Sequence, residues 1–454
     1  MGTSPRPREP AGAEPAGAEP AGADPRAPSQ VRARGQRLAW LDALRGIAAL
    51  SVVYAHFGTR VLPGVHAAVY SVFDPGLYGV LVFFMISGYI VPVSLERKGS
   101  IRTFWVSRLF RLFPLFVFAI AAVLLLHMLG LASLRDTNYN VAASVFGHLF
   151  MLNELLGGAN LIVVLWTLSY EMVFYLLLTA LFTVGLHKRS GWLAAAFAAG
   201  ALLLGGLLPT FWLSSGTLGL TEVALAGDVL IMGGLAIAVL GYGPPRALGA
   251  WLAAATGLFL VAFNERKYAY EGLTILALMF TGTMLRRAQR RQVSRRLAAV
   301  AAISIVIAAI VAGAWHIPAV SPQDQTTLVQ REWAMSVALA GLTFAIGLAL
   351  QNRRVPAAPA WLGLVSYSVY LLHPLLLDFY DSIPFSRGYH HQTGLQVAVT
   401  VAFFAVLLAC CALTYHLVEA PMQRLGRRVI ERLDARFGPD RPGPAKRTLS
   451  QTCW

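Results

Sequence analysis

Long apolar runs separated by short polar segments make up most of the chain from Leu38 onward. A helix needs about 17–25 residues to cross a hydrocarbon core of about 30 Å. Twelve runs have that length: residues 40–59, 76–94, 112–131, 162–186, 192–209, 222–242, 247–264, 269–285, 297–317, 334–350, 361–381 and 394–418. We therefore predict an all-α fold, a polytopic bundle of transmembrane helices. The runs at 192–209 and 247–264 are short and rich in Ala and Gly, so we expect 10–12 spans, the lower number if both are re-entrant or merged with their neighbours.

The basic residues divide the loops into two classes. In the twelve-span count, the Lys and Arg clusters before the first span and after the second, fourth, eighth, tenth and last spans fall on one side. The loops on the other side, near 60–75, 132–161, 318–333 and 382–393, are sparsely basic. Because basic loops are retained in the cytoplasm, both termini are predicted to be cytoplasmic.

The two ends of the chain differ in composition from the spans. Residues 1–37 hold AGAEP, AGAEP and AGADP in succession and no aromatic residue, which predicts a disordered, Pro/Ala/Gly-rich cytoplasmic tail. Residues 38–421 are the predicted transmembrane domain, with Pro421 explained by the end of the last helix. Residues 422–454 are predicted to be a basic cytoplasmic tail, whose first part is a helical segment along the anionic inner leaflet.

Composition supports the membrane assignment. The 454 residues are 57% hydrophobic and only 13% charged, whereas a soluble domain carries about 25% charged residues. The net charge of +15 is distributed as topology signals rather than as a binding stripe, so nucleic acid is not an expected partner. The three cysteines form neither a disulfide framework nor a CxxC site, and we expect no metal.

The first span carries three ionisable side chains. Arg45 and His56 are eleven residues apart, so at 100° per residue they project from one face of the helix, about 20° apart. Asp42 lies three residues before Arg45, at pairing distance. Charge at bilayer depth is costly, so this stripe should face the bundle interior or an aqueous cavity. The structural alternative, a snorkelling Arg and a core His bonded to a carbonyl, explains Asp42 and Arg45 better than it explains His56.

Three positions near the second and third spans are also candidates. Ser87, followed by Gly88, lies in an aromatic run, and close helix packing explains this pair better than chemistry does. Arg108 and Arg111 are three residues apart on one helical edge, which offers two guanidinium forks to phosphate groups. Ordinary positive-inside charge is the alternative for both arginines.

Two later spans contain one candidate each. Glu171 is an acidic group at bilayer depth that needs a partner; Arg45, His56 or another buried polar group could serve. A structural ion pair and a catalytic role fit Glu171 equally well, and it could meet His56 in one cavity. His373 precedes Pro374, which frees a backbone carbonyl and can kink the helix to make room for water or substrate.

Taken together, these segments resemble the acyltransferase-3 family of integral membrane O-acyltransferases. The resemblance rests on LDALRGIAALSVVYAH, with Arg45 and His56 in the family's R-x10-H arrangement, FFMISGYIV, the R-x-x-R of Arg108 and Arg111, WTLSYE, SYSVYLLHP and VEAP, in the family's order over residues 40–421. The sequence departs modestly at Thr167 and Tyr170, and twelve spans would exceed the usual ten.

The resemblance implies transfer of an acyl group, commonly acetyl, from a coenzyme A thioester to a hydroxyl of a carbohydrate or of a glycosylated or other secondary metabolite. We then expect His56 to act as general base, Glu171 to orient or stabilise its imidazole, and Asp42 to hold Arg45. Arg45, Arg108 and Arg111 would bind the phosphates of acyl-CoA, with acetyl-CoA the expected donor, as a co-substrate rather than a permanently bound cofactor. Ser87 and His373 would be structural.

The expected location is the cell membrane, as a multi-pass protein. The competing hypothesis is a multispan transporter or exporter of a glycan or lipid, in which the buried charges form a proton relay.

Overall fold

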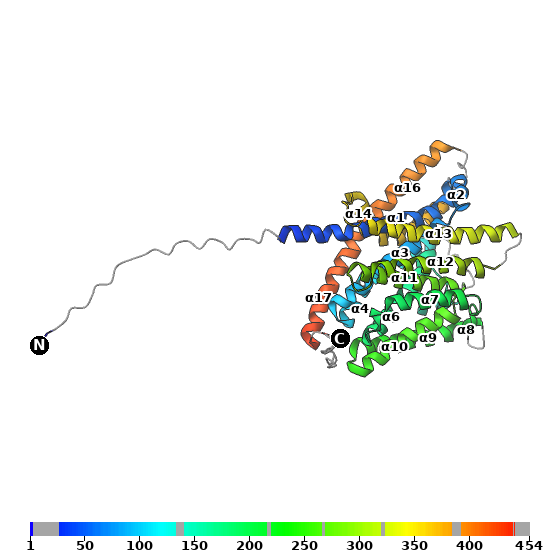
Figure 1. Cartoon of the computed structure of the whole chain (residues 1–454). Helices are drawn as coiled ribbons and strands as arrows, with labels where there is room; N and C mark the ends of the chain where they lie inside the picture. Colours follow the sequence, from blue (N-terminus) through cyan, green and yellow to red (C-terminus); the bar gives the residue numbers. More distant parts are fainter. Residues whose placement is uncertain are drawn as a thin grey trace.

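The computed structural model describes residues 1–2, 27–132, 140–215, 219–265, 268–318, 323–383, 392–438 and 440; the side chains of 27–38 and 323–324 lie outside this description. All regular structure in these residues is helical, and they contain no strand (Figure 1). The all-α prediction is therefore confirmed.

Each predicted span coincides with a helix. The long helices are α1 (Ala27–Val61), α3 (Pro75–Lys98), α4 (Ile101–Met128), η1 (Val163–Leu165) with α6 (Trp166–Thr183), α7 (Ser190–Leu204), α9 (Leu220–Leu240), α10 (Gly243–Phe263), α11 (Ala269–Gln289), α12 (Arg295–His316), α13 (Gln323–Ala349), α14 (Ala357–Leu364) with α15 (Ser366–Ser382), and α16 (Thr393–Thr414). The shorter connecting elements are α2 (Pro63–Tyr70), α5 (Val141–Leu149), η2 (Leu186–Lys188) and α8 (Trp212–Ser215).

The number of spans depends on how polar helices are counted. By length and apolar composition, eight helices of the described residues could cross a membrane, or nine if α14 and α15, which meet at 69°, form one span. Neither α1 nor α11 is among the eight, and α7 has only 15 residues. Because α1 and α11 are packed inside the bundle, their polar side chains contact protein rather than lipid. The predicted 10–12 spans and the side of each terminus remain predictions.

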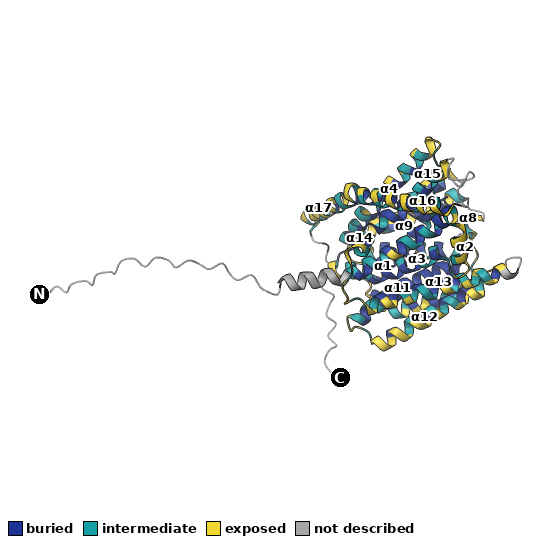
Figure 2. Ribbon diagram, turned by 90° about the horizontal axis from the view of Figure 1, so that it is seen from above, coloured by how far each residue is buried: buried dark blue, intermediate teal, exposed yellow. Residues whose placement is uncertain are grey.

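The centre of the bundle is formed by α1, α3 and α11. Helix α3 packs against both α1 and α11, and α11 also packs against α7. Figure 2 shows buried residues concentrated in the inner helices and exposed residues on outer helices such as α12. Backbones of α3 and α11 touch at glycines: a Cβ on Gly88 would lie 1.8 Å from the carbonyl oxygen of Met279. Small residues permit this close approach between membrane helices, as the sequence predicted for Ser87-Gly88.

The last helix does not end at Pro421, contrary to the sequence interpretation. A π-helical turn, η4 (Tyr415–Glu419), joins α16 to α17 (Ala420–Phe437), and the three form one helical segment of 45 residues (Figure 1). Pro421 is the second residue of α17, and the wider π-helical turn before it accommodates the ring and the missing N–H within the continuous segment. Helix α17 packs against α4.

The predicted tails lie partly outside the described residues. At the N-terminal end, α1 begins at Ala27, before the predicted tail ends at residue 37. At the C-terminal end, the predicted helical segment is α17, and Asp440 is the last described residue. The domain boundaries at 37 and 421 remain predictions.

Candidate functional site

The polar stripe of α1 faces other helices. The face of α1 that bears Arg45 and His56 packs against α3, α14 and α15, and both side chains are half-buried. Arg45 pairs with Asp42, with 3.5 Å between Nη1 and Oδ1. The sequence prediction that Asp42 holds Arg45 therefore agrees with the geometry.

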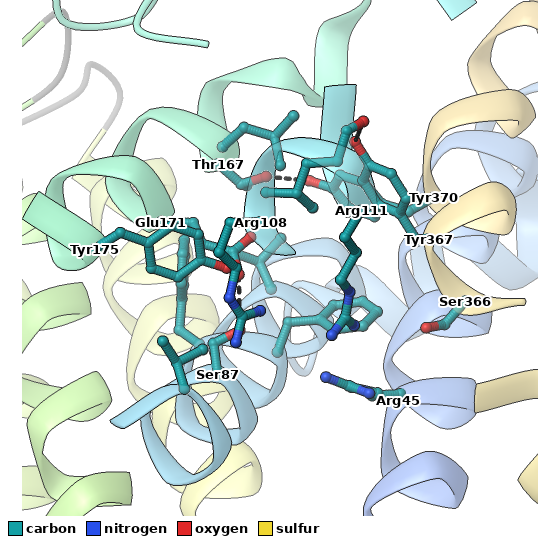
Figure 3. Close-up of a pocket in the computed structure, with 16 residues that line it drawn as sticks. Arg45, Ser87, Arg108, Arg111, Thr167, Glu171, Tyr175, Ser366, Tyr367 and Tyr370 are labelled. Carbon is teal, nitrogen blue, oxygen red and sulfur yellow. Dashed lines mark hydrogen bonds between the residues drawn. The ribbon is translucent and has the colours of Figure 1, made fainter. Parts of the chain in front are cut away.

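A pocket of about 730 Å³, part of it open to solvent, lies where α1, α3, α4, α6 and α15 meet. Figure 3 shows the guanidinium groups of Arg45, Arg108 and Arg111 pointing into this space from α1 and α4. Glu171 is the one carboxylate that lines it, so the pocket carries an excess of positive charge. The other polar residues that line it are Ser87, Thr167, Tyr175, Ser366, Tyr367 and Tyr370.

Arg108 is held firmly at the pocket wall. Its guanidinium lies 5.1 Å from the centre of the Tyr175 ring and 5.6 Å from that of Phe104. Its Nη2 donates a hydrogen bond to Ser94 Oγ at 3.3 Å. Cation–π contacts of this kind orient a guanidinium while leaving other donors for a ligand.

Glu171 is satisfied from two sides. Ser87 Oγ donates a hydrogen bond to its Oε1 at 3.2 Å, and Tyr175 OH donates to the same oxygen. Ser87 therefore lines the pocket and bonds to Glu171, in addition to the packing role of its neighbour Gly88. The partners that the structure gives Glu171 are hydroxyl groups, and its charge acts on the nearby Arg45 and Arg108.

His56 lies beside His373. His373 Nε2 is 3.2 Å from His56 Nδ1, and the two ring centres are 5.2 Å apart. Two backbone carbonyls assign the tautomers: Val52 O lies 3.0 Å from His56 Nδ1, and Val369 O lies 3.0 Å from His373 Nδ1. Since a carbonyl only accepts, each Nδ1 carries the proton, and His373 Nε2 becomes a second acceptor for His56. The lone pair of His56 is then on Nε2.

Neither histidine is among the residues that line the pocket. Tyr370 borders both regions, because it lines the pocket and its ring centre is 6.3 Å from that of His373. Its hydroxyl is 2.7 Å from Thr167 Oγ1 and donates to Val164 O at 3.0 Å. The site thus has a cationic pocket and a histidine pair, with Tyr370 between them.

The predicted residues are therefore brought together in part. Arg45, Ser87, Arg108, Arg111 and Glu171 share the pocket, whereas His56 pairs with His373, which the sequence analysis had treated as structural. Five further polar residues that line the pocket were not predicted as site residues: Thr167, Tyr175, Ser366, Tyr367 and Tyr370. Tyr370 and His373 are three residues apart on α15, so their spacing could have predicted that both side chains lie on the same face of the helix.

Comparison with known proteins places most of the chain within one protein family. Residues 38–416 match the acyltransferase-3 family, described as an acyltransferase domain. Curated relatives include nodulation protein 10 of Rhizobium leguminosarum bv. viciae, 32% identical over 38% of this chain and 52% of that protein. Acyltransferase MdmB of Streptomyces mycarofaciens is 29% identical over 37% of this chain and 45% of that protein.

O-acetyltransferase OatA of Staphylococcus aureus is 28% identical over 33% of this chain and 26% of that protein. The matched region thus spans about half, or less, of the length of these relatives. No solved structure matches the chain.

Proposed function

This chain belongs to the acyltransferase-3 family, and from that membership we propose that it is a multi-pass O-acyltransferase of the cell membrane. The reaction we propose is transfer of an acyl group, with acetyl as the expected group, from acyl-CoA to a hydroxyl. The hydroxyl belongs to a carbohydrate or to a glycosylated or other secondary metabolite. The names of two relatives, an acyltransferase and an O-acetyltransferase, support this reaction class. The observation that carries the proposal is the convergence of three guanidinium groups on one internal pocket.

The cationic pocket suits the donor. Acyl-CoA combines a polyanionic head with a narrow arm that ends in the thioester. Guanidinium groups bind phosphate oxygens in a bidentate manner, so Arg108 and Arg111 are assigned to the phosphates and Arg45 to the inner part of the pocket. Glu171 is held by Ser87 and Tyr175, and its negative charge offsets part of the repulsion between these cations.

The reacting end of the arm is assigned to the histidine pair. Arg45 and His56 are separated by about 16 Å along the axis of α1, so the arginine-lined pocket and the proposed base lie at different depths. Tyr370 borders both regions, so in this scheme its side chain turns aside when the arm enters.

His56 is the proposed general base. The acceptor oxygen attacks the carbonyl carbon of the thioester while its proton moves to Nε2 of His56. The C–S bond then breaks, and the leaving thiolate takes the proton back from the imidazolium. The products are an ester, the thiol of CoA and a neutral His56. His373 Nε2, which accepts from His56 Nδ1, stabilises the imidazolium, following the arrangement of a base with an orienting partner.

The proposal is tested by comparing cells that contain the wild-type gene, the His56→Ala variant or no gene. Mass spectrometry of metabolites and envelope glycans should detect an acetylated product only with the wild type, because base catalysis is worth about 10²–10⁴-fold. Membrane content of the variant, measured by immunoblot, should be unchanged. An active His56→Ala protein would refute the assignment of the base, and uptake or export of an unmodified compound by the wild type would favour the transporter hypothesis.

A further inference from the structure

A second cavity lies outside the internal pocket, between α17, α4 and the end of α3. It encloses about 770 Å³, including space open to solvent. Its cationic side chains are Arg97, Lys98, Arg108, Arg111 and Arg427, and no carboxylate lines it. We refer to it as the α4–α17 groove; its remaining lining residues are Ser94, Phe104, Ser107, Phe110, Gln423, Gly426 and Ile430.

The groove and the internal pocket are adjacent, because Arg108 and Arg111 line both. A ligand that is long and anionic at one end can therefore occupy both, with its phosphates in the groove and its arm directed inward. Lys98 is held over the groove by a hydrogen bond from its Nζ to Ser107 Oγ at 2.9 Å. Among the described residues, neither Arg97 nor Arg427 forms an ion pair with a carboxylate within 4 Å. Glu431, Asp434 and Asp440 line a neighbouring cavity that Arg427 also borders.

Helix α17 is fixed as the outer wall of the groove at two places. At Gly426 it touches α4 so closely that a Cβ would lie 2.7 Å from Phe110 Cβ. Beyond its last turn, buried Asp440 pairs with Arg246 at 2.6 Å and accepts a hydrogen bond from Ser100 Oγ at 3.0 Å. The backbone N–H of Arg102, in the first turn of α4, also donates to Asp440, at 2.9 Å. These contacts hold Arg427 at the groove.

We propose that the α4–α17 groove binds the phosphorylated nucleotide head of the acyl-CoA donor and that Arg427 of α17 contacts its phosphates. This inference rests on the proposed function. It adds an element outside the family match, which ends at residue 416, to the donor site. The alternative source of phosphate is the headgroup of an anionic lipid, which the same cations would attract.

The chain offers a matched control for Arg427. Arg428 is its neighbour on α17, carries the same charge and is also exposed, but it does not line the groove. If the positive charge of α17 acts on the donor only at long range, removing either arginine should weaken donor binding. If Arg427 contacts the phosphates, only the substitution of Arg427 should weaken it.

The test uses the full-length protein in nanodiscs of phosphatidylcholine, with acetyl-CoA and with S-acetylpantetheine, which lacks the nucleotide. Arg427→Gln should raise the KM for acetyl-CoA about tenfold, as expected for one lost charge-assisted bond, and leave kcat unchanged. Kinetics with S-acetylpantetheine should not change, and Arg428→Gln should behave as the wild type. Binding of CoA, measured by calorimetry, should weaken by the same factor.

The failures are distinguishable. Suppose that Arg427→Gln leaves the KM for acetyl-CoA and the affinity for CoA unchanged, while the double variant Arg108→Ala with Arg111→Ala raises the KM and lowers the affinity. The phosphates then bind without a contact to α17, so the groove inference is wrong and the proposed function stands. If the variant has an effect only in nanodiscs containing phosphatidylglycerol, the groove binds lipid and the inference is also wrong. If the wild type neither binds CoA nor transfers acetyl from it, the proposed function itself fails.

Discussion

His56 and His373 show what a single side-chain contact contributes to this site. In a neutral imidazole one ring nitrogen carries a proton and the other a lone pair. The ring can act as a base only if the nitrogen with the lone pair faces the acceptor hydroxyl. The carbonyl of Val52 and Nε2 of His373 both accept from Nδ1 of His56, which leaves the lone pair on Nε2. His373 is fully buried and its own Nδ1 is bound to Val369 O, so it can serve as a fixed acceptor.

We expect His373→Leu to lower kcat for acetyl transfer on the order of 10²-fold, because the imidazolium of His56 loses its acceptor. The KM for acetyl-CoA should change little, since His373 is remote from the phosphate-binding arginines. His373→Gln retains an amide acceptor and should recover part of the lost rate. Steady-state kinetics on both variants, with melting curves to confirm folding, check this; equal kcat values for Leu and Gln variants would mean that His373 only fills space.

At the scale of elements, glycines set the distance between the helices that carry the site. Helix α3 supplies Ser87, and α11 supports α3 from behind through contacts of Gly88 with Met279 and of Gly282 with Met85. In lipid, where apolar burial does not drive helix association, this contact between backbones is a main source of packing energy.

We expect Gly88→Ala to destabilise the bundle by about 1–3 kcal/mol, because a Cβ there cannot avoid the carbonyl of Met279 without separating α3 from α11. Thermal melting of the detergent-solubilised protein should show a lower Tm. Gly233→Ala on α9, where nothing lies within 4 Å of the added Cβ, is the matched control and should melt as the wild type or higher. Equal Tm values for wild type and Gly88→Ala would contradict the close contact.

At the scale of the whole molecule, the basic loops predict one orientation for the donor site. The arginines of the α4–α17 groove belong to clusters that the twelve-span count places in the cytoplasm, where acyl-CoA is found. The groove and the pocket would then open toward the cell interior, with His56 deeper in the membrane.

Orientation can be checked by labelling single cysteines after Cys410, Cys411 and Cys453 are replaced by serine. Ser71→Cys, after α2, should react with a membrane-impermeant maleimide in intact cells, because the loop near 60–75 is predicted to lie outside. Asn352→Cys, between α13 and α14, should react only after permeabilisation. Both side chains are exposed, so protection would come from the membrane; the reverse pattern would invert the predicted topology.

The sequence by itself determined the local properties of this protein. Hydropathy over about 20 residues is a property of one segment, so the positions of the helices and the all-α class followed from it. Charge at bilayer depth is costly, so Arg45, His56 and Glu171 were recognisable as candidates, and the family motifs supported them. The pairing of Asp42 with Arg45 followed from helical spacing alone.

Only the tertiary structure decided which residues meet. His56 and His373 are 317 positions apart, and the sequence offered Glu171, not His373, as the group that orients His56. The packing of α15 against α1 brings His373 to it. Helices α1 and α11 are shielded by neighbouring helices and can be polar, so neither is among the eight helices of the described residues that are long and apolar enough to cross a membrane. Pro421 was expected to end a helix, but a π-helical turn let the chain continue as α17 and enclose a basic groove against α4. Contacts between helices depend on packing across the bundle, and no window of sequence contains that information.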